Sequence, residues 1–269
     1  MEEYNPWEGL SRLRKQQPVV HCINNFVSAP FVANTLLSAG ASPIMAVSPE
    51  ESSEVTAKSH ALVINTGTPT QESFKAMEAS IKAADKHSIP WVLDPVGVGI
   101  SSFRYEKIND LLNKYHPWAI RANTAEIKSL AGNRRQEALD TDESGAEVEN
   151  KVQKLASDLN SIVIASGEVD AISDGQKVIR IKNGHSMMTT ITGTGCVASA
   201  VTGAFLAAED SSFQAAGYAM MVMGITGQLA GQRSEGPASF RSNFIDQLYN
   251  IDPTSLNQNV KADLMTPEQ

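Results

Sequence analysis

The sequence predicts an α/β fold with a central, mostly parallel sheet and helices on both faces. Short apolar runs rich in Val and Ile alternate with longer amphipathic segments, which is the order of repeated strand–helix units. Each run is brief and ends in polar residues or Gly, as buried strands do. Because no repeat, low-complexity tract or linker interrupts this order, we interpret residues 1–269 as one domain.

Buried strands are expected at residues 18–23, 42–47, 61–67, 90–95, 118–123 and 161–167. Two helices are marked by their ends. The segment 31–40 closes on Gly40, a natural C-cap, and the segment 70–88 begins after Thr70, a good N-cap. In the second helix the apolar residues recur on one face, at Phe74, Met77, Ile81 and Ala84.

The last third of the chain has a different pattern. Residues 169–183 alternate around Asp174-Gly175, which predicts a β-hairpin, and residues 195–208 and 211–231 are helical in character. The longest apolar runs, around 195–208 and 215–225, are rich in Gly, Ala, Ser and Thr and fall short of the roughly 20 residues that span a bilayer. The acidic segment 137–150 is expected to be an exposed loop or a helix start.

Composition restricts the partners and the compartment. The formal net charge is -8 and the pI about 5.2, which argues against nucleic acid and against an anionic membrane surface as partners. Only two cysteines are present, Cys22 and Cys196, so no disulfide framework follows and a reducing cytoplasm is expected. The polar, charged start of the chain does not resemble a signal peptide.

Polar residues and glycines follow the ends of the expected strands. In open parallel sheets ligands bind beyond the carboxyl ends of the strands, so this pattern favours a site there. Taken singly, each residue has a simpler explanation as a turn former. The residues are Asn24, Asn25, Met45, Asn65, Gly67, Asp94, Arg121, Asn123, Ser166 and Gly167.

The stretch "TGTGC" (192–196) opens the helical run 195–208. Consecutive amides of Gly193, Thr194 and Gly195 at a helix start favour an anion such as a nucleotide phosphate. No Gly-Lys-Ser/Thr follows, and no GxGxxG opens the chain, so this is neither a Walker A loop nor a dinucleotide fingerprint. The alternative is a Gly-rich turn that lets the helix pack closely.

The stretch "RANTAEI" (121–127) places Asn123 and Glu126 three residues apart. If a helix begins at Thr124, the two side chains converge at its first turn, where a carboxylate favours hydrated Mg²⁺. The simpler alternative is a helix cap with a first-turn acid. Asp94 at another strand end is a second metal candidate, and Arg121 supplies a cation for a phosphate.

Other kinds of site find no support. The five histidines are scattered without zinc spacing, and no Gly-x-Ser-x-Gly elbow is present. A cysteine protease would need a base, and His185 is only the nearest in sequence to Cys196.

With these residues identified, the chain resembles the ribokinase-like superfamily and, within it, the hydroxyethylthiazole kinase family. The resemblance covers nearly the whole chain. Its elements are "HCINNFV" (21–27), "ANTLLSAGASPIMA" (33–46), "NTGT" (65–68), "WVLDPVGVG" (91–99), "IRANTAEI" (120–127), "GEVDAISDG" (167–175), "GTGC" (193–196) and "RSEGPASF" (233–240). Two small departures are Ala122, where Gly is frequent, and Ser166, where Thr is frequent.

The resemblance implies transfer of phosphate from ATP to 4-methyl-5-(2-hydroxyethyl)thiazole with Mg²⁺, in thiamine salvage, by a homotrimer with sites between subunits. ATP is expected at Arg121, Ser166, Asn123, Thr194 and Gly195, and the thiazole at Met45, Gly193, Asn25 and Gly67. The metal is expected at Asp94 and Glu126.

The resemblance places Cys196 in the base position, where many relatives of this superfamily carry Asp. A thiol with a pKa of about 8.5 is a poor base, although a helix N-terminus can lower that pKa. We expect Cys196 to act as a weak base or to orient the substrate hydroxyl, and the alternative is a small residue that fits. Two other functions stay open, a nucleotide-dependent dehydratase of the same fold and a non-catalytic nucleotide-binding regulator.

Overall fold

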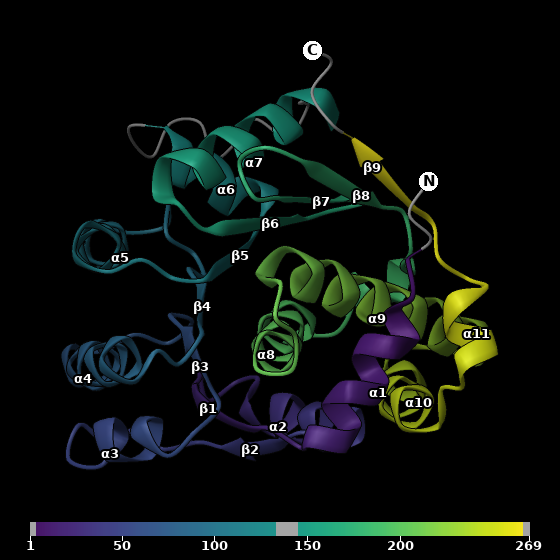
Figure 1. The fold of residues 1–269 in the computed structure, drawn as a ribbon, viewed down its shortest axis with the longest axis horizontal. Helices are drawn as coiled ribbons and strands as arrows, with labels where there is room; N and C mark the ends of the chain where they lie inside the picture. The colour runs from purple at the N-terminus through teal and green to yellow at the C-terminus, as the bar shows by residue number, and fades with distance from the viewer. Residues whose placement is uncertain (1–3, 133–144, 266–269) are drawn as a thin grey trace.

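A computed structural model describes residues 4–132 and 145–265 of the chain (Figure 1). Its strands form one nine-stranded sheet in the order β2-β1-β3-β4-β5-β6-β7-β8-β9. The strands are β1 Val19–Ile23, β2 Ser42–Ile44, β3 Ala61–Asn65, β4 Trp91–Asp94, β5 Ala119–Asn123, β6 Ile162–Ser166, β7 Asp170–Ser173, β8 Val178–Ile181 and β9 Ala262–Met265.

The pairs from β2 through β6 are parallel, and β7, β8 and β9 add antiparallel strands at one end. The predicted α/β class with a mostly parallel sheet is therefore confirmed, and so is the hairpin around Asp174-Gly175, which is β7–β8. A single sheet is what we expect of one kinase domain, which stays our prediction for residues 1–269.

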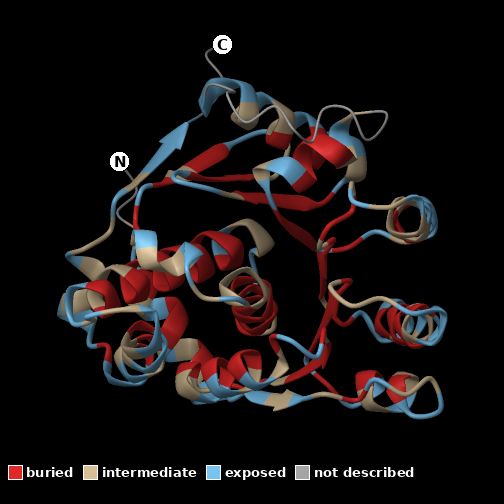
Figure 2. Ribbon diagram, turned by 180° about the vertical axis from the view of Figure 1, so that it is seen from behind, coloured by how far each residue is buried: buried red, intermediate tan, exposed pale blue. Residues whose placement is uncertain are grey.

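Helices cover both faces of this sheet (Figure 1). One face carries α3 Ser52–Ala57, α4 Gln71–His87, α5 Ser102–Lys114, α6 Thr124–Ala131 and α7 Gly145–Leu159. The other carries α1 Pro6–Gln16, α2 Ala29–Ala39, α8 Thr194–Leu206, α9 Ser212–Gln232, α10 Pro237–Asn250 and α11 Pro253–Asn257, with a 3₁₀ turn, η2, at Ser186–Thr189. Each face has its own apolar core, so the strands inside the sheet are mostly buried, whereas the edge strands β2 and β9 are largely exposed (Figure 2).

Local sequence explains the two best-marked helices. Thr70 caps α4 because its Oγ1 accepts from the Ser73 N–H at 3.0 Å, and the predicted apolar face of α4 is buried. In α8 every residue from Val197 to Leu206 is buried, and a Cβ on Gly203 would lie 2.7 Å from the Val63 side chain on β3. Small residues therefore let α8 pack directly on the sheet.

The predicted strand 42–47 is wrong in length, because β2 ends at Ile44. Its register with β1 stops where Ile44 lies opposite His21, and the His21 Nε2 lies 2.8 Å from the Ala46 carbonyl oxygen. The His21 side chain thus occupies the Ala46 carbonyl, which a longer β1–β2 pairing would have used for a backbone hydrogen bond. The predicted segment 137–150 lies partly outside the described residues, and its described part begins α7 at Gly145.

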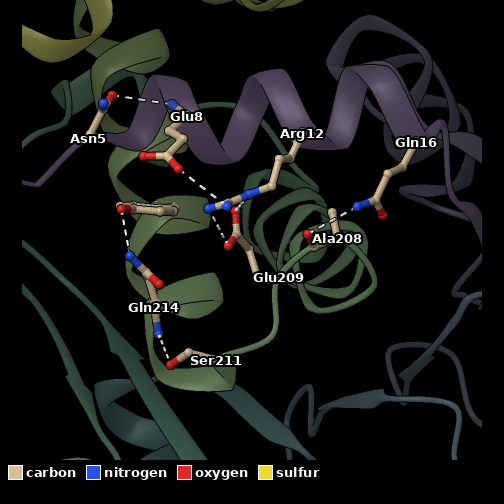
Figure 3. Close-up of polar contacts among 9 residues, drawn as sticks. Asn5, Glu8, Arg12, Gln16, Ala208, Glu209, Ser211 and Gln214 are labelled. Atoms are coloured by element: carbon tan, nitrogen blue, oxygen red, sulfur yellow. Dashed lines mark hydrogen bonds and ion pairs between the residues drawn. The ribbon is translucent and has the colours of Figure 1, made fainter.

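The sequence reasoning did not predict α1, which is bound to the start of the turn after α8. Arg12 on α1 forms an ion pair with Glu209, and Gln16 one turn later donates to the Ala208 carbonyl (Figure 3).

No helix in the described part of the chain combines the length and apolar character that a membrane crossing requires.

Candidate active site at the carboxyl ends of the parallel strands

A chain of hydrogen bonds runs from α8 across the ends of three strands. The Asn25 amide Nδ2 lies 3.3 Å from the Cys196 Sγ and donates to Asn65 Oδ1 at 2.8 Å. Asn65 Nδ2 in turn donates to Asp94 Oδ2 at 2.6 Å. Since β1, β3 and β4 are adjacent and parallel, their polar ends meet here, as the sequence predicts.

Asp94 is fully buried at the far end of this chain. Its Oδ2 also accepts from the Ser199 hydroxyl at 2.8 Å, whereas Oδ1 has no partner among the described residues. Burial raises the pKa of Asp94 to about 7, and Glu126 adds to the rise while Arg121 opposes it. An acid with one unsatisfied buried oxygen is prepared to receive a cation or a donor from outside the chain.

Cys196 lies half-buried in the first turn of α8. Burial raises the pKa of its thiol, and the nearby Asp94 carboxylate raises it further, while side-chain hydrogen bonds from Ser28, Asn25 and Asn65 act in the opposite direction. The helix N-terminus, which can lower the pKa of a thiol, does not reverse this rise. Burial beside an acid therefore favours the thiol form of Cys196 over the thiolate.

The glycines predicted to lie at the thiazole pack against the segment that follows β1. Gly193 precedes α8 with a φ of 93°, and a Cβ there would lie 2.9 Å from the Ser28 Cβ. A Cβ on Gly67 would lie 2.8 Å from the Asn25 Cβ. Asn25, Gly67 and Gly193 are therefore brought together next to Cys196, while Met45 follows β2 and packs partly buried against the core.

The residues predicted to bind ATP lie on the other side of the Gly loop. Arg121 Nη2 donates to the Ser166 hydroxyl, and the Arg121 guanidinium lies so close to Gly195 that no Cβ fits between them. Asn123 lies opposite Ser166 in the β5–β6 register, and Thr194 is the first residue of α8. Arg121 Nε has no partner among the described residues. The free N–H groups at the start of α8 thus lie beside a buried cation.

Asn123 and Glu126 form the helix cap that was the simpler alternative. Asn123 Oδ1 accepts from the Glu126 N–H at 2.9 Å, and Glu126 Oε2 accepts from the Asn123 N–H at 2.9 Å. The buried Glu126 carboxylate does more than cap, because its Oε1 accepts from the Gly97 N–H at 2.8 Å. This contact joins the end of β5 to the loop after β4, and each oxygen retains a second lone pair.

No group of three or more His, Cys, Asp or Glu residues that could hold a metal ion occurs within residues 4–132 and 145–265. Mg²⁺ does not require such a cage, since one or two carboxylates with water and substrate phosphates suffice. The unpartnered Oδ1 of Asp94 and the nearby Glu126 carboxylate supply hard oxygen donors of this kind. The residues present therefore fit a hydrated Mg²⁺ held together with a nucleotide.

Two members of the hydrogen-bonded chain were missing from the predicted site. Asn65 was recognised only as a strand end, and Ser199 was not considered. Ser199 follows Cys196 by three residues, so the two share one face of α8, and this helical spacing was the available signal.

A surface cavity of about 430 Å³, lined by His116, Trp118 and Ser161 among others, lies at the opposite edge of the sheet, before β5 and β6 begin.

The sequence was compared with known protein families. The model of the hydroxyethylthiazole kinase family matches residues 10–254. The chain belongs to the hydroxyethylthiazole kinase family. One member, the hydroxyethylthiazole kinase of Brachyspira hyodysenteriae, is 39% identical over 260 residues, which cover 95% of this chain and 97% of that protein.

Solved structures agree with this family and with the ribokinase-like fold. A hydroxyethylthiazole kinase structure from Pyrococcus horikoshii superposes with a TM-score of 0.90 at 33% identity, covering 97% of this chain and 98% of that one. A ribokinase-like superfamily protein from Enterococcus faecalis has a TM-score of 0.63 at 11% identity, covering 87% of this chain and 88% of that one. At that identity the second likeness concerns the fold alone.

Proposed function

We propose that the chain transfers the γ-phosphate of ATP to the primary hydroxyl of 4-methyl-5-(2-hydroxyethyl)thiazole, releasing ADP and the thiazole phosphate. Membership of the hydroxyethylthiazole kinase family supports this reaction. The observation that carries it is the continuous contact from Cys196 through Asn25 and Asn65 to the buried Asp94. It joins an anion-binding helix start to an acid with an unsatisfied oxygen, the two parts that phosphoryl transfer needs.

In this proposal ATP lies over the start of α8. Arg121, held by Ser166 and packed on Gly195, faces the phosphates, and Asn123 and Thr194 complete the nucleotide side. The amides of Thr194 and Gly195 stabilise the charge that spreads over the transferred group. The fixed guanidinium and helix dipole need no rearrangement as that charge develops.

We propose that Asp94 and Glu126 hold Mg²⁺, Asp94 through its free Oδ1 and Glu126 through water, since both Glu126 oxygens already accept backbone N–H groups. When bound, the ion neutralises phosphate charge. Without it, the two acids near one another disfavour a nucleotide polyanion.

Cys196 orients the substrate hydroxyl in this proposal. The hydroxyl oxygen of the substrate forms its bond to the γ-phosphorus as the bond from that phosphorus to the bridging oxygen of ADP breaks. The hydroxyl proton leaves late in a loose transition state and is released to water, so the thiol sulfur needs only to accept a hydrogen bond that aligns the O–H. Asn25 fixes the sulfur through its Nδ2, which donates to Cys196 Sγ at 3.3 Å. Gly67, Gly193 and Met45 provide the apolar walls for the ring.

We propose a homotrimer with sites shared between subunits. An exposed apolar surface surrounds the edge strand β2 and adjoins Met45. It consists of Phe26 (78% exposed), Val27 (52%), Ile44 (41%) and Val47 (50%). Exposed apolar side chains that follow an edge strand and its neighbour are typical of a subunit contact. Light scattering at working concentration should report about three chains' mass, Phe26→Asp should lower it, and Tyr249→Asp on α10 serves as the exposed aromatic control.

One assay tests the reaction. The protein is incubated with ATP, Mg²⁺ and the thiazole alcohol, and ADP and thiazole phosphate are followed together. Kinase activity requires ADP that depends on the thiazole and matches the phosphate ester mole for mole. A dehydratase or a non-catalytic regulator makes no thiazole phosphate, so the absence of this product would overturn the proposal.

The two free cysteines support a reducing cytoplasmic location, which fractionation of the source cells would test.

A further inference from the structure

Arg104 on α5 binds three backbone carbonyls that belong to two different loops. Its Nη1 donates to the Thr66 carbonyl and, at 2.8 Å, to the Val96 carbonyl, and its Nη2 donates to the Gly67 carbonyl at 2.7 Å. Thr66 and Gly67 follow β3, and Val96 follows β4. A planar guanidinium with a fixed fork of donors is the side chain suited to join two loops in one geometry.

Both loops carry groups of the candidate active site. Gly67 packs against Asn25, which contacts Cys196, and the Gly67 N–H donates to Asn65 Oδ1 at 3.0 Å. Gly97, next to Val96, donates its N–H to Glu126 at 2.8 Å. Arg104 therefore binds the backbone of Gly67 on the thiazole side and of Val96 on the metal side, and it joins the two sides of the site.

The place of Arg104 in α5 is unfavourable for the helix itself. It lies in the first turn, where its own N–H is capped by Ser101, and no acidic residue occurs in that turn. The positive end of the helix dipole disfavours a cation at this position. Partial burial also lowers the pKa of the Arg104 guanidinium, against the attraction of Glu126. The presence of an arginine at position 104 is therefore explained by its three hydrogen bonds to carbonyls and not by the stability of α5.

We propose that Arg104 is a positioning residue that sets the loop after β3 and the loop after β4 for thiazole and Mg²⁺ binding, while the ATP side is set independently by Arg121. The proposal rests on the proposed kinase function. It predicts a split between substrates, since the ATP side is built from β5, β6 and α8, which Arg104 does not contact through the hydrogen bonds described above.

Arg14 provides a matched control within the same chain. It is also a half-buried arginine on a helix that donates to three carbonyls, those of Leu248 at 2.6 Å, Tyr249 at 3.1 Å and Ile251 at 3.5 Å. These carbonyls lie at the end of α10, and none belongs to a residue of the candidate site. Arg14→Ala removes the same number of hydrogen bonds to backbone carbonyls, together with a cation–π contact to Trp7, so it reports the structural cost of such a change away from the site.

The test is steady-state kinetics of Arg104→Ala and Arg14→Ala beside the parent. Arg104→Ala should raise the KM for the thiazole and the half-saturating Mg²⁺ concentration by about 10–100-fold, the range for losing a supporting contact, with the KM for ATP unchanged. Arg104→Lys, which keeps the charge but not the fork, should fall between parent and Ala, and it carries the test if the Ala variant does not fold. Guanidinium ion at low concentration should partly rescue Arg104→Ala.

Arg14→Ala should leave the ratio of the two KM values at the parent's value. Equal shifts in both KM values for Arg104→Ala, or the same split in Arg14→Ala, would overturn the positioning role. Hydrogen exchange of the 65–68 and 96–99 amides, measured without substrates, separates this proposal from the reaction. A parent that makes no thiazole phosphate refutes the function, but faster exchange in Arg104→Ala still supports the two-loop contact, and unchanged exchange refutes it.

Discussion

Asp94 and Glu209 are both buried acids, and they are stabilised in different ways. The Glu209 side chain is 3% exposed and lies against Arg12, with Nε donating to Oε1 at 3.0 Å and Nη2 lying 2.8 Å from Oε2 (Figure 3). Asp94 is fully buried, and the hydrogen bonds described for it come from the neutral groups of Asn65 and Ser199.

The difference separates an acid that holds the fold from one that is available for function. A bidentate arginine satisfies both oxygens of Glu209, so its charge joins α1 to the turn after α8. Burial raises the pKa of both acids, to about 7 for Asp94, but only Asp94 leaves one of its oxygens without a partner among the described residues. We therefore expect changes at Asp94 to affect turnover and changes at the Arg12–Glu209 pair to affect stability.

The largest expected effect is on turnover, from Asp94→Asn. Removing one positioned charge from a phosphoryl-transfer site should lower turnover by about 100–1000-fold. Thermal unfolding without Mg²⁺ at pH 8 should show equal or higher stability, because a buried charge without a direct cation is costly. A variant that kept its turnover but lost stability would make Asp94 an acid like Glu209.

The stability of the parent and that of Asp94→Asn should depend differently on pH. Asp94 in the unfolded chain releases its proton near pH 3.8, whereas in the folded parent it holds the proton up to about pH 7. In this interval the folded state binds more protons, so this group's contribution to stability falls as the pH rises from about 4 to 7. Asp94→Asn, unfolded in EDTA, should lack that decline. The same slope in both proteins would contradict it.

Next is Glu126→Gln. The cap geometry holds Glu126 by two backbone N–H groups, and the amide retains only one acceptor for them. Since Glu126 is proposed to act on the metal through water, the half-saturating Mg²⁺ concentration should rise by about 10–100-fold. A magnesium titration at saturating ATP measures it, with the exposed Glu72→Gln on α4 as control. An unchanged titration would remove Glu126 from the metal site.

Cys196→Ala should have a smaller effect, about 10-fold on turnover, below the usual gain from a general base. Burial raises the pKa of Cys196, so ionisation of this thiol should contribute no rise in turnover between pH 7 and 9. A climb that Ala abolishes would show a thiolate base. Isotope exchange between ADP and ATP without thiazole would instead show a phosphorylated cysteine, and either result ends the orienting role.

The smallest effect on turnover is expected from Arg12→Ala, at most about 2-fold at 25 °C. Its stability should fall by about 1–3 kcal/mol, the cost of leaving a buried charged group unpaired. Adding Glu209→Gln should recover part of that loss, which denaturant unfolding of both variants measures. A large turnover defect in Arg12→Ala would break the contrast between the two acids.

Local patterns in the sequence located most of the parallel strands and the polar residues at their ends, although they missed α1 and overestimated the length of β2. Val- and Ile-rich runs marked the strands, Thr70 marked the start of α4, and Asn123 with Glu126 marked the start of α6. These features depend on neighbours within a few residues, so they can be read without a structure. The polar strand ends also indicated the correct edge of the sheet, because parallel strands end together.

The strand order and the burial decided everything that joins distant residues. Asn25 and Cys196 meet, and so do Arg104 and Gly67, only because β1, β3 and β4 are neighbours under α8 and beside α5. The sequence alone pointed to a helix dipole that lowers the pKa of Cys196, yet desolvation and Asp94 raise it. Charge, pKa and contact depend on what surrounds a group in space, and periodicity along the chain carries no information about that surrounding.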